Sequence, residues 1–118
     1  MLEHRYRFHG HGSVRRLYQH GDTVRQRAVT LRYRKNPSRV HSRVTIVVAK
    51  KVFKAATKRN RIRRRIYEIV RRHWNDLEQP YDIAIIVFDG ATMVIPHEEL
   101  EAVVLQLLNE AGLVKKAD

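Results

Sequence analysis

A dense run of cationic side chains is the chemically most informative feature of this 118-residue sequence. The segment from Lys50 to Arg72 contains eleven Lys and Arg residues and one acidic residue, Glu68. A guanidinium group can hold a phosphate through two hydrogen bonds and can stack on nucleotide bases. Ordinary solvated helix faces mix both signs of charge, so a nearly single-sign run is more typical of a phosphate-binding surface.

These cations fall on a predicted helix that begins between residues 54 and 58 and is stopped by Pro80. On this helix, Arg61, Arg64 and Arg65 are neighbours, and Lys58 lies one turn before Arg61. Like charges at this spacing disfavour an isolated helix, and bound phosphate would relieve the repulsion. The predicted core-facing residues recur with the helical period: Ile62, Ile66, Ile69, Val70, His73 and Leu77.

The charge of the whole chain points to a polyanionic partner. The net charge is +12, and 22 of the 24 Lys and Arg residues precede residue 76, together with only three of the 12 acidic residues. Nucleic acid is favoured over an anionic membrane, because the apolar side of the basic helix is needed for the core. We expect no membrane partner, no small-molecule substrate and, since cysteine is absent, a cytoplasmic protein.

The remaining pattern predicts one domain over residues 1–118, with flexible ends at 1–11 and 113–118. A short helix capped by Ser13 is expected to end at Gly21, followed by a strand over 23–34 that can break near Gln26. Further strands are expected at 43–49 and 81–88, and a last helix between Pro96 and Gly112. The strand–helix–strand unit predicts a parallel pair, for which a right-handed crossover is the default.

Aromatic residues accompany the cations in the first third of the chain. Phe8, Tyr18 and Tyr33 lie among arginines, and stacking of a base on an aromatic ring contributes about 1–3 kcal/mol in single-strand binding sites. Tyr18 and Tyr33 could equally be core residues with their hydroxyls at the rim. The sequence leaves these two interpretations open.

A longer pattern resembles the bacterial ribonuclease P protein family. It consists of Ala49-Lys50-Lys51, a short loop, and then Lys58-Arg59-Asn60-Arg61-Ile62-Arg63-Arg64. His20-Gly21, Tyr81-Asp82-Ile83 and the last helix follow in the family's order, so the resemblance covers about residues 7–112. Two positions depart from it: Phe53 stands where glycine is common, and Val14 where an aromatic residue is common.

The resemblance implies an α+β fold of order αβββαβα with a four-stranded mixed sheet, like the second domain of ribosomal protein S5. It also implies a left-handed βαβ crossover in place of the default. The implied function is that of the non-catalytic protein subunit of ribonuclease P. This enzyme removes the 5′ leader of precursor tRNA, and its RNA subunit carries the active site and the Mg²⁺ ions.

Two RNA-binding surfaces are implied by the same resemblance. The first would contact the catalytic RNA and comprises Lys50, Lys51, Lys58, Arg59, Asn60, Arg61, Arg63, Arg64 and Arg65. The second is a cleft between the first helix and the sheet that would take the single-stranded leader. Its matching residues are Phe8, Val14, Tyr18, Arg32 and Tyr33.

Two other functions fit part of the pattern. A structural RNA-binding protein of the ribosomal type could carry the same charge and fold. A metal-dependent nuclease would need ligands such as Asp82 and Asp89, for which a role in turns is favoured. The histidines at 4, 9 and 11 lack a cysteine or carboxylate to complete a metal site, so we expect neither a metal site nor catalytic residues.

Overall fold

The computed structural model describes residues 6–7, 11–90 and 95–115 and confirms the order αβββαβα. A short 3₁₀ helix, Trp74–Asp76, precedes the last strand. The elements are α1 (His11–His20), β1 (Asp22–Gln26), β2 (Val29–Lys35), β3 (Arg43–Val48), α2 (Ala56–Arg72), β4 (Tyr81–Val87) and α3 (His97–Glu110).

The four strands form one mixed sheet in the order β1-β2-β4-β3. β1, β2 and β4 are antiparallel neighbours, whereas β3 and β4 are parallel and joined through α2, as predicted. The predicted break near Gln26 is confirmed, because Arg27 and Ala28 form a turn in which Arg27 has a φ of 50°. The left-handed crossover stays a prediction.

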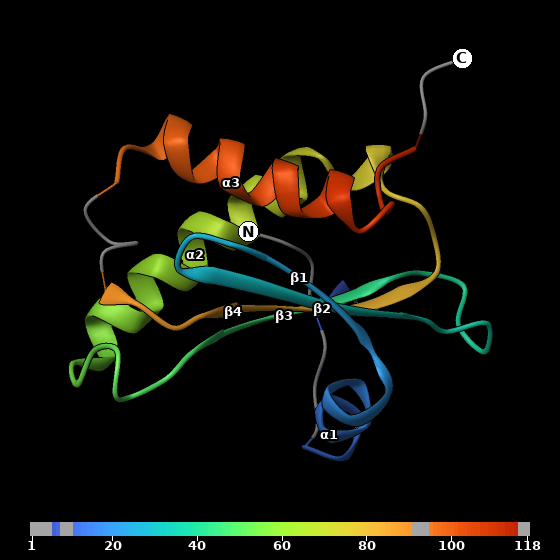
Figure 1. Cartoon of the computed structure of the whole chain (residues 1–118), viewed down its shortest axis with the longest axis horizontal. Coiled ribbons are helices and arrows are strands. Elements are labelled where there is room, and N and C mark those ends of the chain that lie inside the picture. The colour runs from blue at the N-terminus through green and yellow to red at the C-terminus, as the bar shows by residue number, and fades with distance from the viewer. Residues whose placement is uncertain (1–5, 8–10, 91–94, 116–118) are drawn as a thin grey trace.

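The helices lie on opposite faces of the sheet (Figure 1). α2 and α3 cover one face, where the apolar residues of β2, β3 and β4 form the main core with both helices. α1 lies on the other face, where Leu17 packs on Ala84 of β4. This second face is only partly covered, since Thr30, Thr45 and Ile86 remain half-buried there.

The predicted signals at the ends of α3 are confirmed. Pro96 precedes its first turn, and Gly112 follows its end with a φ of 72°. The amides of Gly112 and Leu113 donate to the carbonyls of Asn109 and Leu108, which satisfies the last carbonyls of the helix. Leu113 is fully buried as a result.

Several residues near the chain ends have contacts that the sequence pattern did not predict. Arg7 forms a parallel bridge with Val44, and Val114 forms an antiparallel bridge with Leu77. The amide of Lys115 donates to the carbonyl of Asp76 over 2.7 Å. The described residues of the segments 1–11 and 113–118, which we expected to be flexible, are therefore tied to the domain.

Two predicted helix boundaries are wrong. α1 begins at His11, so Ser13 lies in its first turn and is not its N-cap residue. α2 ends at Arg72, not at the turn before Pro80, and His73 is its C-cap residue. The 3₁₀ helix that follows turns Leu77 into the core, where it is fully buried without belonging to the helix. Leu77 is apolar and lies four residues after His73, so the sequence pattern wrongly placed it on the same helix.

Candidate nucleic-acid interface

The first half of α2 carries an exposed cationic surface on a buried apolar base. Ile62 and Ile66 are fully buried, as the helical period predicted. No acidic residue lies in the first turn of the helix, and Arg61 and Arg64 are exposed. Repulsion between the cations disfavours the helical conformation locally. Packing of the apolar side against the core therefore stabilises the helix.

The predicted cations of this region divide into two groups. Within the described residues, Lys50, Lys51, Lys58, Arg61 and Arg64 are exposed and form no ion pair. Arg59, Arg63 and Arg65 are only partly exposed and donate hydrogen bonds to other parts of the chain. We call the first group the cationic surface. Its five members are available to an anionic ligand.

The three other arginines have structural contacts. Arg65 donates to the carbonyl of Ile95 over 3.0 Å and so ties α2 to the segment before α3. Arg63 donates to Oδ1 of Asn60, which occupies the acceptor of that amide. The sequence could not separate these residues from the cationic surface, because their partners are backbone atoms or neighbours on the helix.

Arg59 holds the loop that precedes α2. Its Nη1 donates to the carbonyls of Phe53 and Lys54, over 2.7 and 2.8 Å. Phe53 itself packs against the core beside Gly90, where a Cβ atom would lie 3.3 Å from the phenyl ring. The loop that departs from the family pattern at Phe53 is therefore held in place by the packing of Phe53 and by the two hydrogen bonds of Arg59.

The hydrogen bonds of Arg59 predict that replacing Arg59 and replacing Arg61 affect stability differently. Arg59→Ala should lower the free energy of unfolding by about 1–3 kcal/mol, because two charge-assisted hydrogen bonds are lost. Arg61→Ala should change it by less than about 0.5 kcal/mol, since Arg61 is exposed. Urea denaturation of the two variants measures this difference. Equal stabilities would contradict the structural role of Arg59.

The single carboxylate of α2, Glu68, is paired with an arginine that does not belong to the cationic surface. Hydrogen bonds from Arg71 are the main cause that lowers the pKa of Glu68 to about 2, and burial acts in the opposite direction. Arg71 lies in the last turn of α2, far from Lys58. Glu68 is thus ionised at neutral pH and paired with Arg71 in the last turn of the helix.

A second candidate surface lies between α1 and the sheet. Arg32 of β2 donates to the carbonyl of Tyr18, and its guanidinium lies 5.5 Å from the centre of the Tyr18 ring. Tyr18 is 38% exposed. Burial raises the pKa of its hydroxyl, and the charge of Arg32 lowers it in part. An aromatic face and a cation therefore lie together, as a stacking site for single-stranded RNA requires.

The other residues predicted for this cleft are placed differently. Val14 is half-buried and packs against Leu17 and Ala84. Tyr33 lies on the opposite face of β2 from Arg32, against the main core and 6.5 Å from Tyr81. The structure therefore does not bring Tyr33 to the α1 face, since successive residues of a strand point to opposite sides. Phe8 lies outside the described residues.

Arg7 lies beside the cationic surface, although the sequence pattern did not indicate this. Its bridge to Val44 places it beside α2, where its guanidinium lies 5.9 Å from the centre of the Tyr67 ring. Arg7 lines one pocket together with five residues of α2, which are Thr57, Asn60, Arg63, Arg64 and Tyr67. No local signal could reveal this, because a bridge between residues 7 and 44 depends on the tertiary fold.

The described residues bear on two alternatives raised by the sequence, a metal site and a membrane partner. In residues 6–7, 11–90 and 95–115, no three His, Asp or Glu side chains come close enough together to hold a metal ion. Asp82 is paired with Arg43, and the histidines at 4 and 9 lie outside the described part. Among the described helices, none is long and apolar enough to cross a membrane.

Comparison with known proteins identifies the family. A family model described as Ribonuclease P matches residues 2–112. The ribonuclease P protein component of Symbiobacterium thermophilum is 32% identical, covering 94% of this chain and 95% of the relative. That of a Synechococcus strain is 31% identical and covers 100% and 90% of the two chains. The chain belongs to the ribonuclease P protein family.

Solved structures of ribonuclease P proteins share the fold. A mutant of the Staphylococcus aureus RNase P protein superposes with a TM-score of 0.84 at 26% identity, covering 92% of this chain and 90% of that one. The Thermotoga maritima RNase P protein gives a TM-score of 0.79 at 24% identity, with 88% and 96% covered. The resemblance seen in the lysine pair and the Arg-Asn-Arg run is thereby confirmed.

Proposed function

We propose that this chain is the protein subunit of a ribonucleoprotein, ribonuclease P, which removes the 5′ leader of precursor tRNA. In this proposal the chain binds the catalytic RNA and the single-stranded leader, and the RNA subunit carries out the cleavage. Family membership supports the assignment. The absence of cysteine is consistent with a cytoplasmic setting, where tRNA precursors are processed.

The cationic surface is the observation that carries the proposal. Its lysines and arginines are exposed, lack ion pairs within the described residues and are held by the buried side of α2. A preformed cationic surface binds RNA phosphates without first ordering its own backbone. Each neutralised phosphate also releases counterions, which adds to affinity at low salt.

Tyr18 and Arg32 are proposed to receive the leader. They lie on the α1 face of the sheet, where half-buried Thr30, Thr45 and Ile86 leave the surface open. A flexible single strand could stack a base on Tyr18 and place a phosphate near Arg32. Duplex RNA would not fit this role, because its bases are stacked on one another.

We propose that the RNA subunit binds the Mg²⁺ that cleavage needs. Mg²⁺ prefers carboxylate and other oxygen ligands, and the described residues bring no cluster of acidic side chains together. The cationic surface would repel a divalent cation, so the residues present do not fit a Mg²⁺ site. This chain would instead reduce the repulsion between phosphates that Mg²⁺ otherwise screens.

Reconstitution tests the proposal directly. Cleavage of a precursor tRNA by ribonuclease P RNA is measured with and without this chain, at a low Mg²⁺ concentration. We expect the chain to lower the KM for precursor tRNA by about tenfold or more, which corresponds to about 1.4 kcal/mol of added binding. The chain by itself should not cleave.

Two results would count against the proposal. Cleavage by the purified chain without RNA would favour a stand-alone nuclease. An unchanged KM in the presence of stoichiometric chain, with binding to unrelated structured RNA intact, would favour a structural RNA-binding protein. Mature tRNA serves as the control ligand, because it lacks the leader and its affinity should change little.

A further inference from the structure

The pocket that Arg7 forms with α2 is lined by three cations and by no acidic residue. Its volume is about 530 Å³, within the range of roughly 300–1,000 Å³ that is usual for small-ligand sites. The cations are Arg7, Arg63 and Arg64, and the other lining residues are Thr57, Asn60 and Tyr67. We call this site the Arg7 pocket. An aromatic ring, cations and small polar groups together are what a nucleotide-binding site needs.

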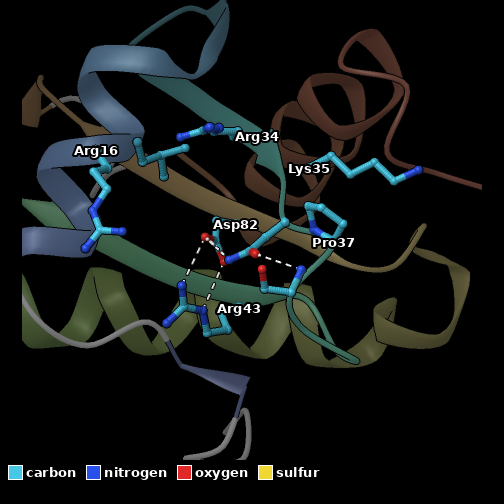
Figure 2. A pocket seen from close by; sticks show the side chains of 9 residues that line it. Arg16, Arg34, Lys35, Pro37, Arg43 and Asp82 are labelled. Atoms are coloured by element: carbon cyan, nitrogen blue, oxygen red, sulfur yellow. Dashed lines mark hydrogen bonds and ion pairs between the residues drawn. The ribbon is translucent and has the colours of Figure 1, made fainter.

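The basic pocket beside α1 is built differently (Figure 2). Asp82 lines it and accepts two hydrogen bonds from Arg43, from Nε to Oδ1 and from Nη2 to Oδ2, each 3.0 Å long. That wall therefore contains a carboxylate, which is a strong acceptor. The Arg7 pocket has no such acceptor in its lining. Its ligand must therefore offer mainly acceptors to the donors that surround it.

The Arg7 side chain is held in place but has no hydrogen-bond partner in the described part of the chain. Its guanidinium lies 5.9 Å from the centre of the Tyr67 ring, and its backbone forms a bridge with Val44 of β3. Its Nε atom is buried and donates to no acceptor there. Buried donors in native proteins are nearly always hydrogen-bonded. The unpartnered donor of Arg7 therefore points to a ligand that accepts hydrogen bonds.

Tyr67 gives the pocket a fixed aromatic side. The Tyr67 side chain is only 8% exposed, and its hydroxyl accepts a hydrogen bond from the backbone amide of Ile46 over 3.4 Å. Ile46 and Val44 belong to the same strand, so β3 holds both Tyr67 and Arg7. The planes of an aromatic ring and a guanidinium group are surfaces on which an unstacked base can lie. The site is therefore prepared for a base, and not only for a phosphate.

The hydrogen-bonding groups of the pocket favour guanine. Oδ1 of Asn60 already accepts a hydrogen bond from Arg63, so the amide group that Asn60 offers to a ligand is its donor. Arg7 and Arg64 have only donors, and neither forms an ion pair among the residues described. Guanine presents two neighbouring acceptors, O6 and N7, which an arginine binds with two hydrogen bonds. Adenine places its N6 amino donor beside N7, and this donor would face other donors here.

We infer that the Arg7 pocket binds a single guanine nucleotide, with Arg7 bonded to O6 and N7 of the base and Arg64 close to the phosphate. The nucleotide is either an unstacked guanosine of the partner RNA or a free guanine nucleotide. For the first source the inference rests on the proposed function. It adds recognition of a base to the attraction of phosphates by the cationic surface.

Titration of the isolated chain with GMP, AMP and 7-deaza-GMP tests the preference for the base. The three nucleotides carry the same phosphate, and 7-deaza-GMP differs from GMP only in lacking the N7 acceptor. Binding is followed by NMR of the ¹⁵N-labelled chain, through the side-chain amide signal of Asn60 and the Nε–H signal of Arg7. We expect GMP to bind about tenfold more tightly than either of the other two, because only GMP makes both hydrogen bonds with Arg7.

Arg7→Lys separates base recognition from charge. This variant keeps the positive charge but loses the planar fork of donors, so its affinity for GMP should fall about tenfold, to the level seen for AMP. Arg71→Lys is the matched control, because Arg71 is an exposed arginine of α2 that does not line the pocket. Its affinity for GMP should be unchanged. Urea denaturation checks that both variants are folded, and the comparison of nucleotides on the unmodified chain tests the inference without any variant.

Competition then identifies the source of the nucleotide. Displacement of GMP by ribonuclease P RNA, but not by the same concentration of mature tRNA, would assign the guanosine to the catalytic RNA. GMP that stays bound in the complex with ribonuclease P RNA would identify a free nucleotide as the ligand.

Equal affinities for the three nucleotides, or an unchanged affinity of Arg7→Lys for GMP, would overturn the inference. The titration needs neither the RNA subunit nor cleavage, so its outcome does not depend on the proposed function. If GMP is preferred but reconstitution with ribonuclease P RNA fails, the proposed function fails and the pocket stands. If reconstitution succeeds and the three nucleotides bind equally, only the pocket is overturned.

Discussion

Replacing Arg61 and Arg64 together with alanine should weaken binding of the chain to ribonuclease P RNA by about a hundredfold at low salt. Both side chains are exposed and free of ion pairs within the described residues. If each holds one phosphate with about 1.4 kcal/mol, the two losses add to about two factors of ten. The slope of log affinity against log salt should also become shallower by about 1–2.

A matched variant controls for charge alone. Arg71→Ala with Arg72→Ala removes two exposed arginines from the last turn of the same helix, where they pair with Glu68 and Glu101. This control should lose less than about fivefold in affinity, since distant surface charge acts only through screened attraction. Equal losses in both double variants would mean that net charge, and not the cationic surface, determines RNA binding.

Truncating Ile66 should have the largest effect on stability. Ile66 is fully buried in α2, within the core formed by the sheet, α2 and α3. Ile66→Ala is expected to lower the free energy of unfolding by about 2–5 kcal/mol, through lost burial and the cavity left behind. Because small domains are only marginally stable, this loss is a large fraction of the total stability of the chain.

The more conservative Ile66→Val variant separates packing from other effects. It removes one methylene group and should cost about 0.5–1.5 kcal/mol in the same urea denaturation. At temperatures where both variants are folded, RNA affinity should be nearly unchanged, because Ile66 touches no ligand in the proposal. A stable Ile66→Ala variant would show that α2 does not depend on its apolar side for support.

The agreement between sequence and structure is best where a short repeat carries the information. The helical period of α2 depends on residues three or four apart in the chain, so Ile62 and Ile66 could be assigned to the core correctly. Alternation along β2 places Tyr33 and Arg32 on opposite sides of the strand. The resemblance grouped those two residues in one cleft, and the structure places them on opposite faces.

The sequence alone therefore determined the core side of α2 and the concentration of positive charge on it, because both follow from residues close together in the chain. It also determined the order of elements, except that it left open the division of residues 23–34 into two strands. Only the tertiary structure decided which cations are free. Arg59 donates hydrogen bonds to the carbonyls of Phe53 and Lys54, and Arg43 is paired with Asp82. A pocket lined by Arg16 of α1 and Arg34 of β2 likewise exists only because folding brings α1 against the end of β2. Such contacts join residues far apart in the chain or depend on loop conformation, and neither is encoded in any local pattern.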